Sequence, residues 1–476
     1  MNSKHILYII GIVLLSAFSA CTDDETFSTS TSNLLTFSTD TVRLDTTFSN
    51  VPTTAKSLWL FNRSGAGIRL SSVRLENGNQ SGYRVNVNGT YLGPTVGYQD
   101  HDIEIRKGDS IRIFVELTSA SQRSDVPQLV EDNLIFNYES GVEQKVNLNG
   151  YSWDATLLQS PRISHDTLIS STKPVVVFGG MYVDSAATLT LGQGTTLYFH
   201  ENAGLHVYGK LISSGTPENN VVLRGDRIDH MFDYLPYDRT PGQWRGIHFY
   251  ASSYDNRLQF TDLHSAYSGI VCDSADITRT KVSLFQSTIH NCQNAGIATY
   301  NNKVEISNCL LSNNGGGCAV FNGGDINMSN TTLAQFYPFS ANRKAAIIFS
   351  GKLYPLQTLN VYNSLITGYS NDELMGYPGD TFNYQFVNCI IRTPRITGAD
   401  SVKFARVIYE DVKDTTKYGE KHFVKLDTDN LIYDFHLDSI SAAIGAADPA
   451  SSSQQDRDGR ERDDKPDVGC YEYIKK

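Results

Sequence analysis

The densest group of residues that could do chemistry lies between positions 224 and 245. Aromatic rings stack on the C–H faces of sugars, while carboxylates and guanidinium groups hydrogen-bond to sugar hydroxyls. A loop of this kind on a rigid scaffold is typical of a binding site, and we predict that it contacts a glycan. Trp244 has a second interpretation, in which its ring anchors the loop to the fold. The candidate residues are Asp226, Arg227, Asp229, His230, Asp233, Tyr237, Asp238, Arg239, Trp244 and Arg245.

A second candidate is a set of regularly spaced cations, Arg257, Lys281 and Lys303. They lie five residues before Asp262, Gln286 and Asn308, which occupy equivalent positions of a repeat, called the polar column. Because this offset is odd, we expect all three cations to point outward from neighbouring strands. In a chain of net charge −11 they would form a local basic stripe, which suits an anionic sugar chain. The alternative is a solvated strand face on which Lys303 pairs with Glu305.

Two enzymatic interpretations use the same residues. A polysaccharide lyase needs a base, and Lys281 or Lys303 could remove the proton next to a uronate carboxylate. A glycoside hydrolase needs two facing carboxylates, one with a raised pKa. The loop offers four candidates for that pair, Asp226, Asp229, Asp233 and Asp238. Neither set matches a specific catalytic motif, so the sequence leaves open whether the protein is an enzyme.

The elements that must position these residues form a repeat. Apolar residues occupy the positions two and four before each member of the polar column, such as Ile306 and Val304 before Asn308. An apolar period of two that recurs about every 22 residues predicts one strand per coil of a solenoid. Because the column shares its parity with the apolar positions, we expect it to point inward as a ladder of stacked amides. Its members are Asp262, Gln286, Asn308, Asn330, Asn363 and Asn388.

This pattern resembles the right-handed parallel β-helix of pectate lyases, other polysaccharide lyases and phage tailspikes. The resemblance implies an all-β fold with a β-helix over residues 159–430. Residues 431–476 are similar to the capping segments of extracellular β-helix proteins, which block open strand edges. Within them, Asp456-x-Asp458-Gly459 begins like a calcium loop, but Asp467 stands where an EF-hand has its Glu. We expect an Asp/Arg ion-pair network there, with calcium as the alternative and no other cofactor.

Residues 34–158 consist of short alternating runs, such as residues 56–61 and 111–115, with turn signals between them. This alternation predicts an antiparallel β-sandwich. The stretch over residues 35–75 resembles the immunoglobulin-like modules found near the N-termini of envelope proteins. The resemblance implies an immunoglobulin-like fold, which is often used as a spacer, and we carry over nothing beyond the fold.

The N-terminus predicts where the protein is located. Residues 1–20 contain Lys4, an apolar run over residues 6–15 and then small residues, which together indicate a secretory signal peptide. Residues 17–21 resemble a bacterial lipobox, which implies that Cys21 is acylated. The acidic residues 22–25 resemble the export tag of Bacteroidota surface lipoproteins, and residues 21–33 are expected to form a tether. We therefore expect a lipid-anchored protein on the outer face of the outer membrane.

The remaining cysteines form no CxxC pair and no Cys/His cluster, so a structural zinc site is not expected and we assign no metal ligands. We expect small buried packing residues at Cys272, Cys292, Cys309, Cys318, Cys389 and Cys470. Acidic residues outnumber basic ones by 51 to 40, which argues against a nucleic-acid partner.

Together these features predict a surface lipoprotein that presents a β-helix on a sandwich spacer and binds a polysaccharide or another glycan. One alternative is a polysaccharide lyase or glycoside hydrolase. Another is an adhesin or envelope scaffold, whose loop would bind a protein partner in the outer membrane.

Overall fold

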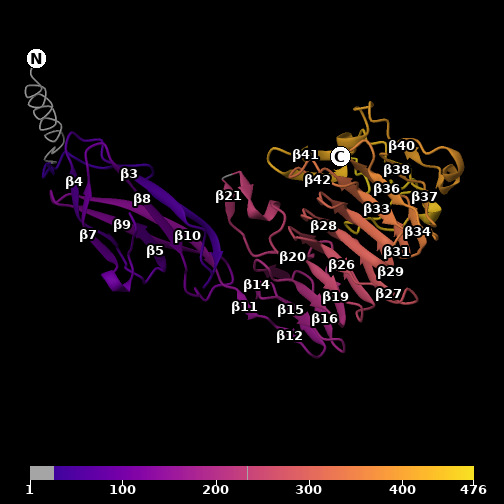
Figure 1. Ribbon diagram of the computed structural model, residues 1–476, viewed down its shortest axis with the longest axis horizontal. Coiled ribbons are helices and arrows are strands. Elements are labelled where there is room, and N and C mark those ends of the chain that lie inside the picture. Colours follow the sequence, from indigo (N-terminus) through magenta and orange to yellow (C-terminus); the bar gives the residue numbers. More distant parts are fainter. Residues whose placement is uncertain (1–25, 233, 476) are drawn as a thin grey trace, which may run out of the picture. The chain divides into compact units, whose positions relative to one another are not determined.

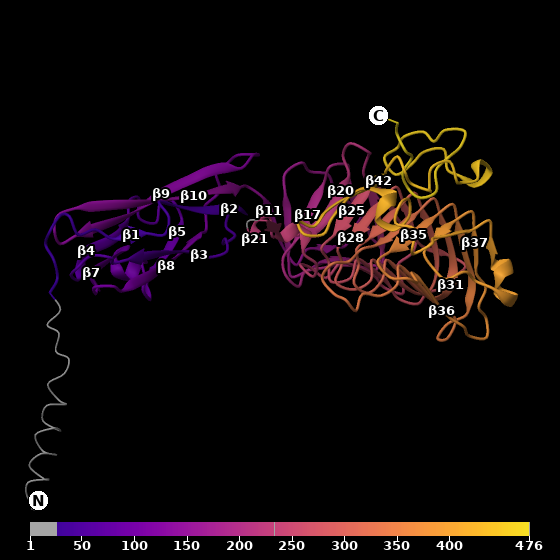
Figure 2. The same ribbon diagram turned by 90° about the horizontal axis from the view of Figure 1, so that it is seen from above.

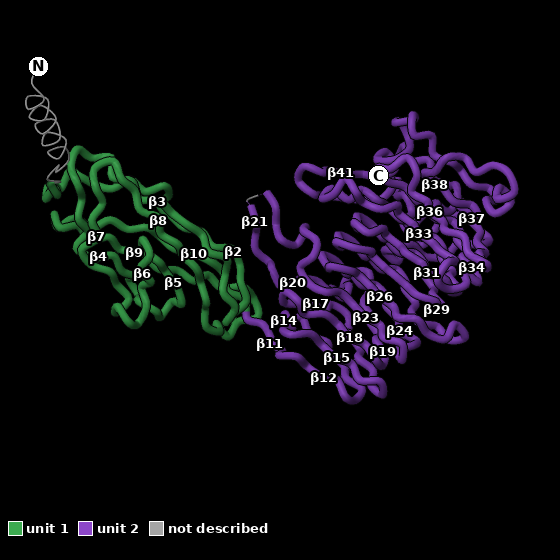
Figure 3. Tube along the Cα trace, viewed as in Figure 1, with its two compact units in different colours: residues 1–153 green, residues 154–476 purple. Residues whose placement is uncertain are grey.

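The structure is a computed structural model that describes residues 26–232 and 234–475. The chain divides into two compact units, residues 1–153 and 154–476, which Figure 3 shows in two colours. The predicted all-β fold is confirmed, because a β-sandwich is followed by a parallel β-helix. The expected signal peptide and Cys21 lie outside the described residues. No helix in the described part of the chain is long and apolar enough to cross a membrane.

Unit 1 is a sandwich of two five-stranded sheets, in which β2 and β10 form a parallel pair and the other neighbours are antiparallel. Alternate side chains of the strands are buried, as in β8, because successive residues of a strand point to opposite faces. In spatial order the first sheet contains β1 (Thr36–Phe37), β3 (Lys56–Phe61), β8 (Ser110–Leu117), β5 (Tyr83–Val87) and β6 (Thr90–Tyr91). The second contains β2 (Thr41–Phe48), β10 (Glu143–Trp153), β9 (Gln128–Tyr138), β4 (Ile68–Leu75) and β7 (Gln99–Ile105).

The described part of the expected tether lies against this sandwich. The backbone of Ser28 donates to the carbonyl of Gly67 at 2.9 Å, and Gly67 donates to the carbonyl of Thr26 at 3.0 Å. The guanidinium of Arg69 lies 4.5 Å from the ring centroid of Phe27. Residues 26–28 are therefore part of the folded unit and do not form a free stalk.

Unit 2 is a parallel β-helix whose coils contribute strands to three rows. One row is an eleven-stranded sheet of the described residues, and the other two are joined into one sheet by the long strands β29 (Ile297–Ser307) and β31 (Ala319–Ser329). Figures 1 and 2 show the strands stacked along the solenoid. Side chains in equivalent positions, such as Leu263, Ile289 and Leu311, pair in register and fill the core.

The eleven-stranded sheet contains β11 (Thr156–Gln159), β14 (Val175–Phe178), β17 (Thr196–Phe199), β20 (Val221–Gly225), β25 (Thr261–His264), β28 (Thr288–His290), β30 (Leu310–Ser312), β32 (Thr332–Gln335), β35 (Leu365–Gly368), β38 (Ile390–Ile391) and β40 (Ile408–Tyr409). The larger sheet contains β29, β31, β12 (Arg162–Ile163), β13 (Thr167–Ile169), β15 (Met181–Val183), β16 (Thr188–Leu191), β18 (Leu205–Val207), β19 (Lys210–Ser214), β23 (Ile247–Phe249), β24 (Asn256–Gln259), β26 (Ile270–Cys272), β27 (Thr280–Phe285), β33 (Ile347–Ser350), β34 (Leu356–Tyr362), β36 (Leu374–Tyr377), β37 (Gln385–Val387) and β39 (Phe404–Ala405).

The predicted packing role of the cysteines is confirmed. All six cysteines of the described residues are buried and carry free thiols. Burial raises the pKa of Cys272 and of Cys292 to about 12, so these thiols remain protonated and unreactive at neutral pH.

The prediction of an inward amide ladder is wrong. The column occupies a turn between two rows, where its residues have left-handed backbone angles, such as φ 53° at Asn308 and φ 47° at Asn363. Asparagine tolerates this conformation better than most residues, which explains its recurrence. Inward and outward positions alternate along each strand, but the turn shifts this alternation by one residue. The direction of a side chain after the turn therefore cannot be counted from the strand before it. In the coil that contains Asp262, the turn is occupied by Phe260 (φ 45°) and not by Asp262.

The side chains of this turn column bind the C-terminal segment instead of one another. Asn363 Nδ2 donates to Ser452 Oγ at 3.0 Å, Ser453 Oγ lies 2.9 Å from Asn308 Oδ1, and Gln286 Nε2 donates to the carbonyl of Asp456 at 3.0 Å. Residues 448–456 therefore run back along the side of the solenoid.

The hairpin of β41 (Phe423–Asp427) and β42 (Ile432–Leu437) also packs on the side of the solenoid. Phe435 and Leu437 form a cluster with Leu310, Leu365 and Ile390, which lie on the outer face of the eleven-stranded sheet. The C-terminal segment, expected as a cap, thus covers a lateral face along several coils.

Candidate functional site

Two adjacent strands of the eleven-stranded sheet bring three polar side chains together on its outer face. Asp262 and His264 belong to β25, and His290 belongs to β28. Between them Leu263 and Ile289 point into the core, and the register places His264 beside His290. Their rings are stacked with centroids 4.8 Å apart, close to the spacing of neighbouring strands.

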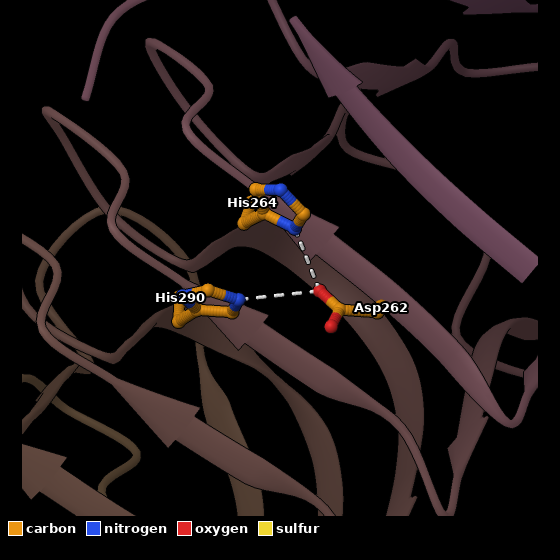
Figure 4. A group of neighbouring side chains, drawn as sticks. All are labelled: Asp262, His264 and His290. Carbon is orange, nitrogen blue, oxygen red and sulfur yellow. Dashed lines mark hydrogen bonds and ion pairs between the residues drawn. The ribbon is translucent and has the colours of Figure 1, made fainter. Parts of the chain in front are cut away.

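Both histidines face the same carboxylate, as Figure 4 shows. His264 Nδ1 lies 2.8 Å from Asp262 Oδ1, and His290 Nε2 lies 3.2 Å from the same oxygen. Leu263 and Ile289 hold the two strands in register through the core.

The long loop adds a second carboxylate. Asp238 lies in the 3-10 helix η2 (Tyr237–Arg239), and its Oδ1 is 2.7 Å from His264 Nε2. Arg224, at the end of β20, holds the same oxygen at 2.9 Å. His264 is thus placed between two carboxylates. We call Asp238, Asp262, His264 and His290 the Asp–His cluster.

The charges of the cluster stabilise one another. Burial alone would raise the pKa of Asp238, but the hydrogen bond and charge of His264, with Arg224, lower it to about 2. Burial likewise opposes ionisation of Asp262, yet His264 and His290 hold its pKa well below the usual range. Burial lowers the pKa of His264, and the two carboxylates overcome this and raise it to about 9. At neutral pH His264 is therefore a cation between two anions.

A cavity of about 470 Å³ opens above the cluster. Three chain segments surround it, because the loop, the outer face of the solenoid and the C-terminal hairpin meet there. Arg239 of the loop donates to the carbonyl of Asn430, between β41 and β42, at 2.8 Å. The side chains of Asp262 and His290 remain 32% and 27% exposed, so a ligand in the cavity can reach them. Its polar lining includes Asp238, Arg239, Asp262, His264, His290, Asn291, Asn313 and Arg457.

Other candidates of the loop lie elsewhere in it. Asp226 is buried and lies 2.6 Å from His200 Nδ1, and burial raises its pKa although His200 opposes this. Arg227 binds Asp229 at 2.6 Å, and its guanidinium lies 3.7 Å from the ring centroid of Tyr237.

Two further loop candidates also lie away from the cluster. His230 belongs to β21 (His230–Phe232), which pairs with β22 (Leu235–Pro236), and Arg245 donates to Asn202 at 2.6 Å. Asp233 lies outside the described residues.

Trp244 is an anchor, as the second interpretation proposed. Its side chain is completely buried and stacks on Phe199, with centroids 4.3 Å apart. Its Nε1 donates to the carbonyl of His264 at 2.8 Å. Trp244 is therefore inaccessible to a ligand, but it fixes the end of the loop to the strand that carries His264.

The predicted basic stripe does not form. Arg257 pairs in register with Ser283, and Lys303 pairs with Thr280, so the two cations lie in different rows of side chains. An irregularity between Thr280 and Val282 takes Lys281 out of the alternation. Lys281 is completely buried, and its Nζ donates to the carbonyl of Tyr250 at 2.5 Å.

The outer face of the larger sheet instead carries an amide ladder. Asn327 donates to Glu305 at 3.3 Å, Asn360 donates to Asn327 at 3.0 Å, and Gln385 donates to Asn360 at 2.8 Å. These polar groups satisfy one another across neighbouring strands, which favours a structural role for them.

The carboxylates of the expected calcium loop have other partners. Asp456 Oδ1 accepts the backbone N–H groups of Asp458 and Arg460, both at 2.9 Å, and its Oδ2 accepts that of Glu472 at 3.1 Å. Asp458 lies 2.9 Å from His436 Nε2 and 3.6 Å from Arg460. Of the expected Asp/Arg network, Asp458 is paired with Arg457 and Arg460, whereas Arg462 pairs with Glu472.

Sequence reasoning missed the two histidines. The sequence does contain a signal for them. His264 and His290 are 26 positions apart, which is close to the length of one coil, and Asp262 lies two positions before His264. Residues one coil apart lie side by side in a solenoid. The repeat aligns Asp262 with the polar column, although its side chain lies on the outer face of the sheet.

Comparisons with known proteins support the fold of unit 2. The family model described as right handed beta helix region matches residues 165–333, and together with the parallel sheets this identifies a right-handed β-helix domain. No curated protein matches the chain.

Two solved structures have weak similarity to parts of the chain. One belongs to a study of glycolipid glycan hydrolysis by a family 123 glycoside hydrolase from Clostridium perfringens, with 7% identity, a TM-score of 0.17 and 25% of this chain covered. The chain spans only 26% of that hydrolase. The other is the ASH/PapD-like domain 7 of human CEP192, with 11% identity, a TM-score of 0.18, and 29% of this chain and 95% of that domain covered. Scores this low carry no argument about fold or activity.

Proposed function

We propose that this protein binds a glycan in the cavity above β25 and β28. The observation that carries the proposal is the convergence of charged and amide side chains from three chain segments on a cavity of about 470 Å³. That volume suits a small ligand or one or two units of a sugar chain. Sugar hydroxyls both donate and accept, and the cavity offers an acceptor in Asp262 and a donor in Arg239.

The electrostatics of the cavity favour binding over hydrolysis. A two-carboxylate hydrolase needs one carboxyl group with a raised pKa, which can donate a proton near neutral pH. In the Asp–His cluster the pKa values of both carboxyl groups are lowered. Burial raises the pKa of Asp226, but that residue does not line the cavity. A lyase based on Lys281 is also disfavoured, because that side chain is completely buried.

Retention of the purified protein in affinity gels that contain neutral or uronate polysaccharides tests this proposal. Arg239→Ala removes a guanidinium from the cavity wall, and we expect it to weaken retention at least tenfold. Arg245→Ala is the matched control, because it is the same change in the same loop at a residue that does not line the cavity. Equal retention of both variants would contradict the assignment of the cavity. Release of sugar products would identify an enzyme instead.

A second candidate function is protein binding by the tip of the loop. Met231, Phe232 and Tyr234 are 41%, 54% and 59% exposed, although large apolar side chains are normally covered. Such a tip suits a partner in the outer membrane, as expected for an adhesin or scaffold. Pull-down from outer membranes that is lost with Phe232→Ser and unchanged with Arg239→Ala would favour this function.

We also propose a lipid anchor at Cys21 and display on the outer membrane surface. The proposal is supported by the apolar run and the lipobox-like residues 17–21. Labelling with a radioactive fatty acid should mark the wild-type protein, and Cys21→Ser should abolish the label. Persistent labelling of that variant would refute the anchor site.

A further inference from the structure

We infer that Asp262, His264 and His290 form a binding site for one divalent transition-metal ion. The three side chains each offer a donor atom, and these atoms all lie within 4.8 Å of one another. Within the described residues no other group of three His, Cys, Asp or Glu side chains is arranged in this way. This inference does not depend on the proposed glycan binding, since the ligands for the metal belong to the protein.

Two of the three distances between the donor atoms are close to those that such an ion requires. Metal–ligand bonds of about 2.0–2.2 Å at tetrahedral angles place neighbouring donors about 3.3–3.6 Å apart. The two histidine nitrogens that face Asp262 Oδ1 lie at 2.8 and 3.2 Å from it. A small outward movement of the side chains therefore admits an ion, which displaces the proton between His264 and Asp262.

The surroundings also resemble those of known metal sites. A histidine that binds a metal usually donates its second ring N–H to a carboxylate, which orients the ring. Asp238 occupies that place for His264, at 2.7 Å from Nε2, and Arg224 holds Asp238 in turn. Trp244 anchors the backbone of His264 from the other side.

The ligand types select the class of metal. Two imidazoles and one carboxylate suit zinc and its first-row neighbours, whereas calcium and magnesium prefer oxygen ligands alone. The partial exposure of Asp262 and His290 leaves the ion open to the cavity, so a water molecule or a ligand hydroxyl could complete its coordination.

A second histidine provides an internal control. His436 lies between Asp434 and Asp458, at 2.6 and 2.9 Å, much as His264 lies between two carboxylates. The neighbours of Asp458 are Arg457 and Arg460 rather than a second histidine. Asp434 and Asp458 contact opposite nitrogens of the His436 ring, so their oxygens do not converge with one ring nitrogen on a single point, and the His436 group should not bind a metal ion.

Calorimetric titration with zinc chloride, after the purified full chain has been treated with a chelator and dialysed, tests the inference. We expect one zinc ion per chain, an affinity at least tenfold lower in His290→Ala, and no change in His436→Ala. Asp238→Asn keeps the three ligands and should lower the affinity about tenfold to 100-fold. Cobalt(II) should give a visible absorption band that is absent in His290→Ala.

Several outcomes would overturn the inference: no zinc uptake, uptake unchanged by His290→Ala, or equal losses in His290→Ala and His436→Ala. Circular dichroism of each variant separates loss of ligand from loss of fold. Affinity gels run with and without chelator separate the two proposals. Zinc uptake without glycan retention supports the metal site and contradicts glycan binding. Glycan retention by a chain that takes up no zinc supports glycan binding and contradicts the metal site.

Discussion

At the residue scale, a buried carboxyl group predicts how the stability of the β-helix depends on pH. Glu373 is completely buried, and its two oxygens accept backbone N–H groups from Ser370 and Ala346, both at 2.8 Å. Burial raises its pKa to about 7, although these N–H groups oppose the shift. The folded state therefore holds this proton more tightly than the unfolded state does. The resulting stabilisation is complete below about pH 4.5 and is lost as the pH rises to about 7.

Glu373→Gln removes this titration. Relative to the wild type, the free energy of unfolding of the variant should improve by on the order of 3 kcal/mol between pH 4.5 and pH 8, because a shift of one pKa unit corresponds to about 1.4 kcal/mol. Urea denaturation of both proteins at the two pH values measures the change. A constant difference between them would show that Glu373 has an ordinary pKa in the folded state.

The roles of single residues were the hardest to predict from the sequence. Trp244 and Tyr237 look alike in a list of loop aromatics, yet only the fold shows that Trp244 is buried against Phe199. A strand irregularity beside Lys281 turns the side chain of Lys281 inward. No residue type in that stretch predicts the irregularity. The pairing of His264 with His290 follows from coil length alone, whereas the contact with Asp238 depends on how the loop folds back.

At the element scale, the turn column predicts how the C-terminal segment is held. The Asn363 side chain accepts the backbone N–H of Asp448 at 3.0 Å and donates to the Ser451 and Ser452 hydroxyls. Asn363→Gly keeps the left-handed backbone but removes these bonds. It should destabilise the docked segment by about 1–3 kcal/mol, since it leaves the buried groups unpaired.

Hydrogen exchange at the Asp448 amide should report this loss as faster exchange. Asn301→Gly is the matched control, because Asn301 also has a left-handed backbone (φ 51°) but its amide donates to Ala275 instead of the C-terminal segment. Equal acceleration of exchange at Asp448 in both variants would mean that the turn column does not hold the segment.

The strands themselves could be predicted from the sequence, and their connections could not. A period of two with a coil of about 22 residues is enough to indicate stacked parallel strands, because each coil needs its neighbours to bury its apolar face. The asparagines marked a real structural position, but the left-handed turn changed where they point. The C-terminal segment that covers these asparagines is distant in the sequence, and Asp448, for example, is more than 80 positions from its partner Asn363.

At the scale of the whole molecule, the two units have separate hydrophobic cores. The sandwich core includes Leu60, and the β-helix core includes Leu263; both side chains are completely buried. The sequence reflects this division as a change from antiparallel alternation to the coil repeat. Stability should therefore be a property of each unit and not of the chain as one cooperative body.

Leu60→Ala and Leu263→Ala form a matched pair that tests this independence. Each removes the same buried atoms, and we expect a loss of about 2–5 kcal/mol in the unit that carries it. Hydrogen exchange followed by mass spectrometry at increasing urea measures both units in one sample. Peptides of residues 26–153 should lose protection earlier in Leu60→Ala, and those of residues 154–475 only in Leu263→Ala. If either change lowered the protection of both units, the chain would unfold as a single unit, since only coupled cores transmit a local cavity to distant amides.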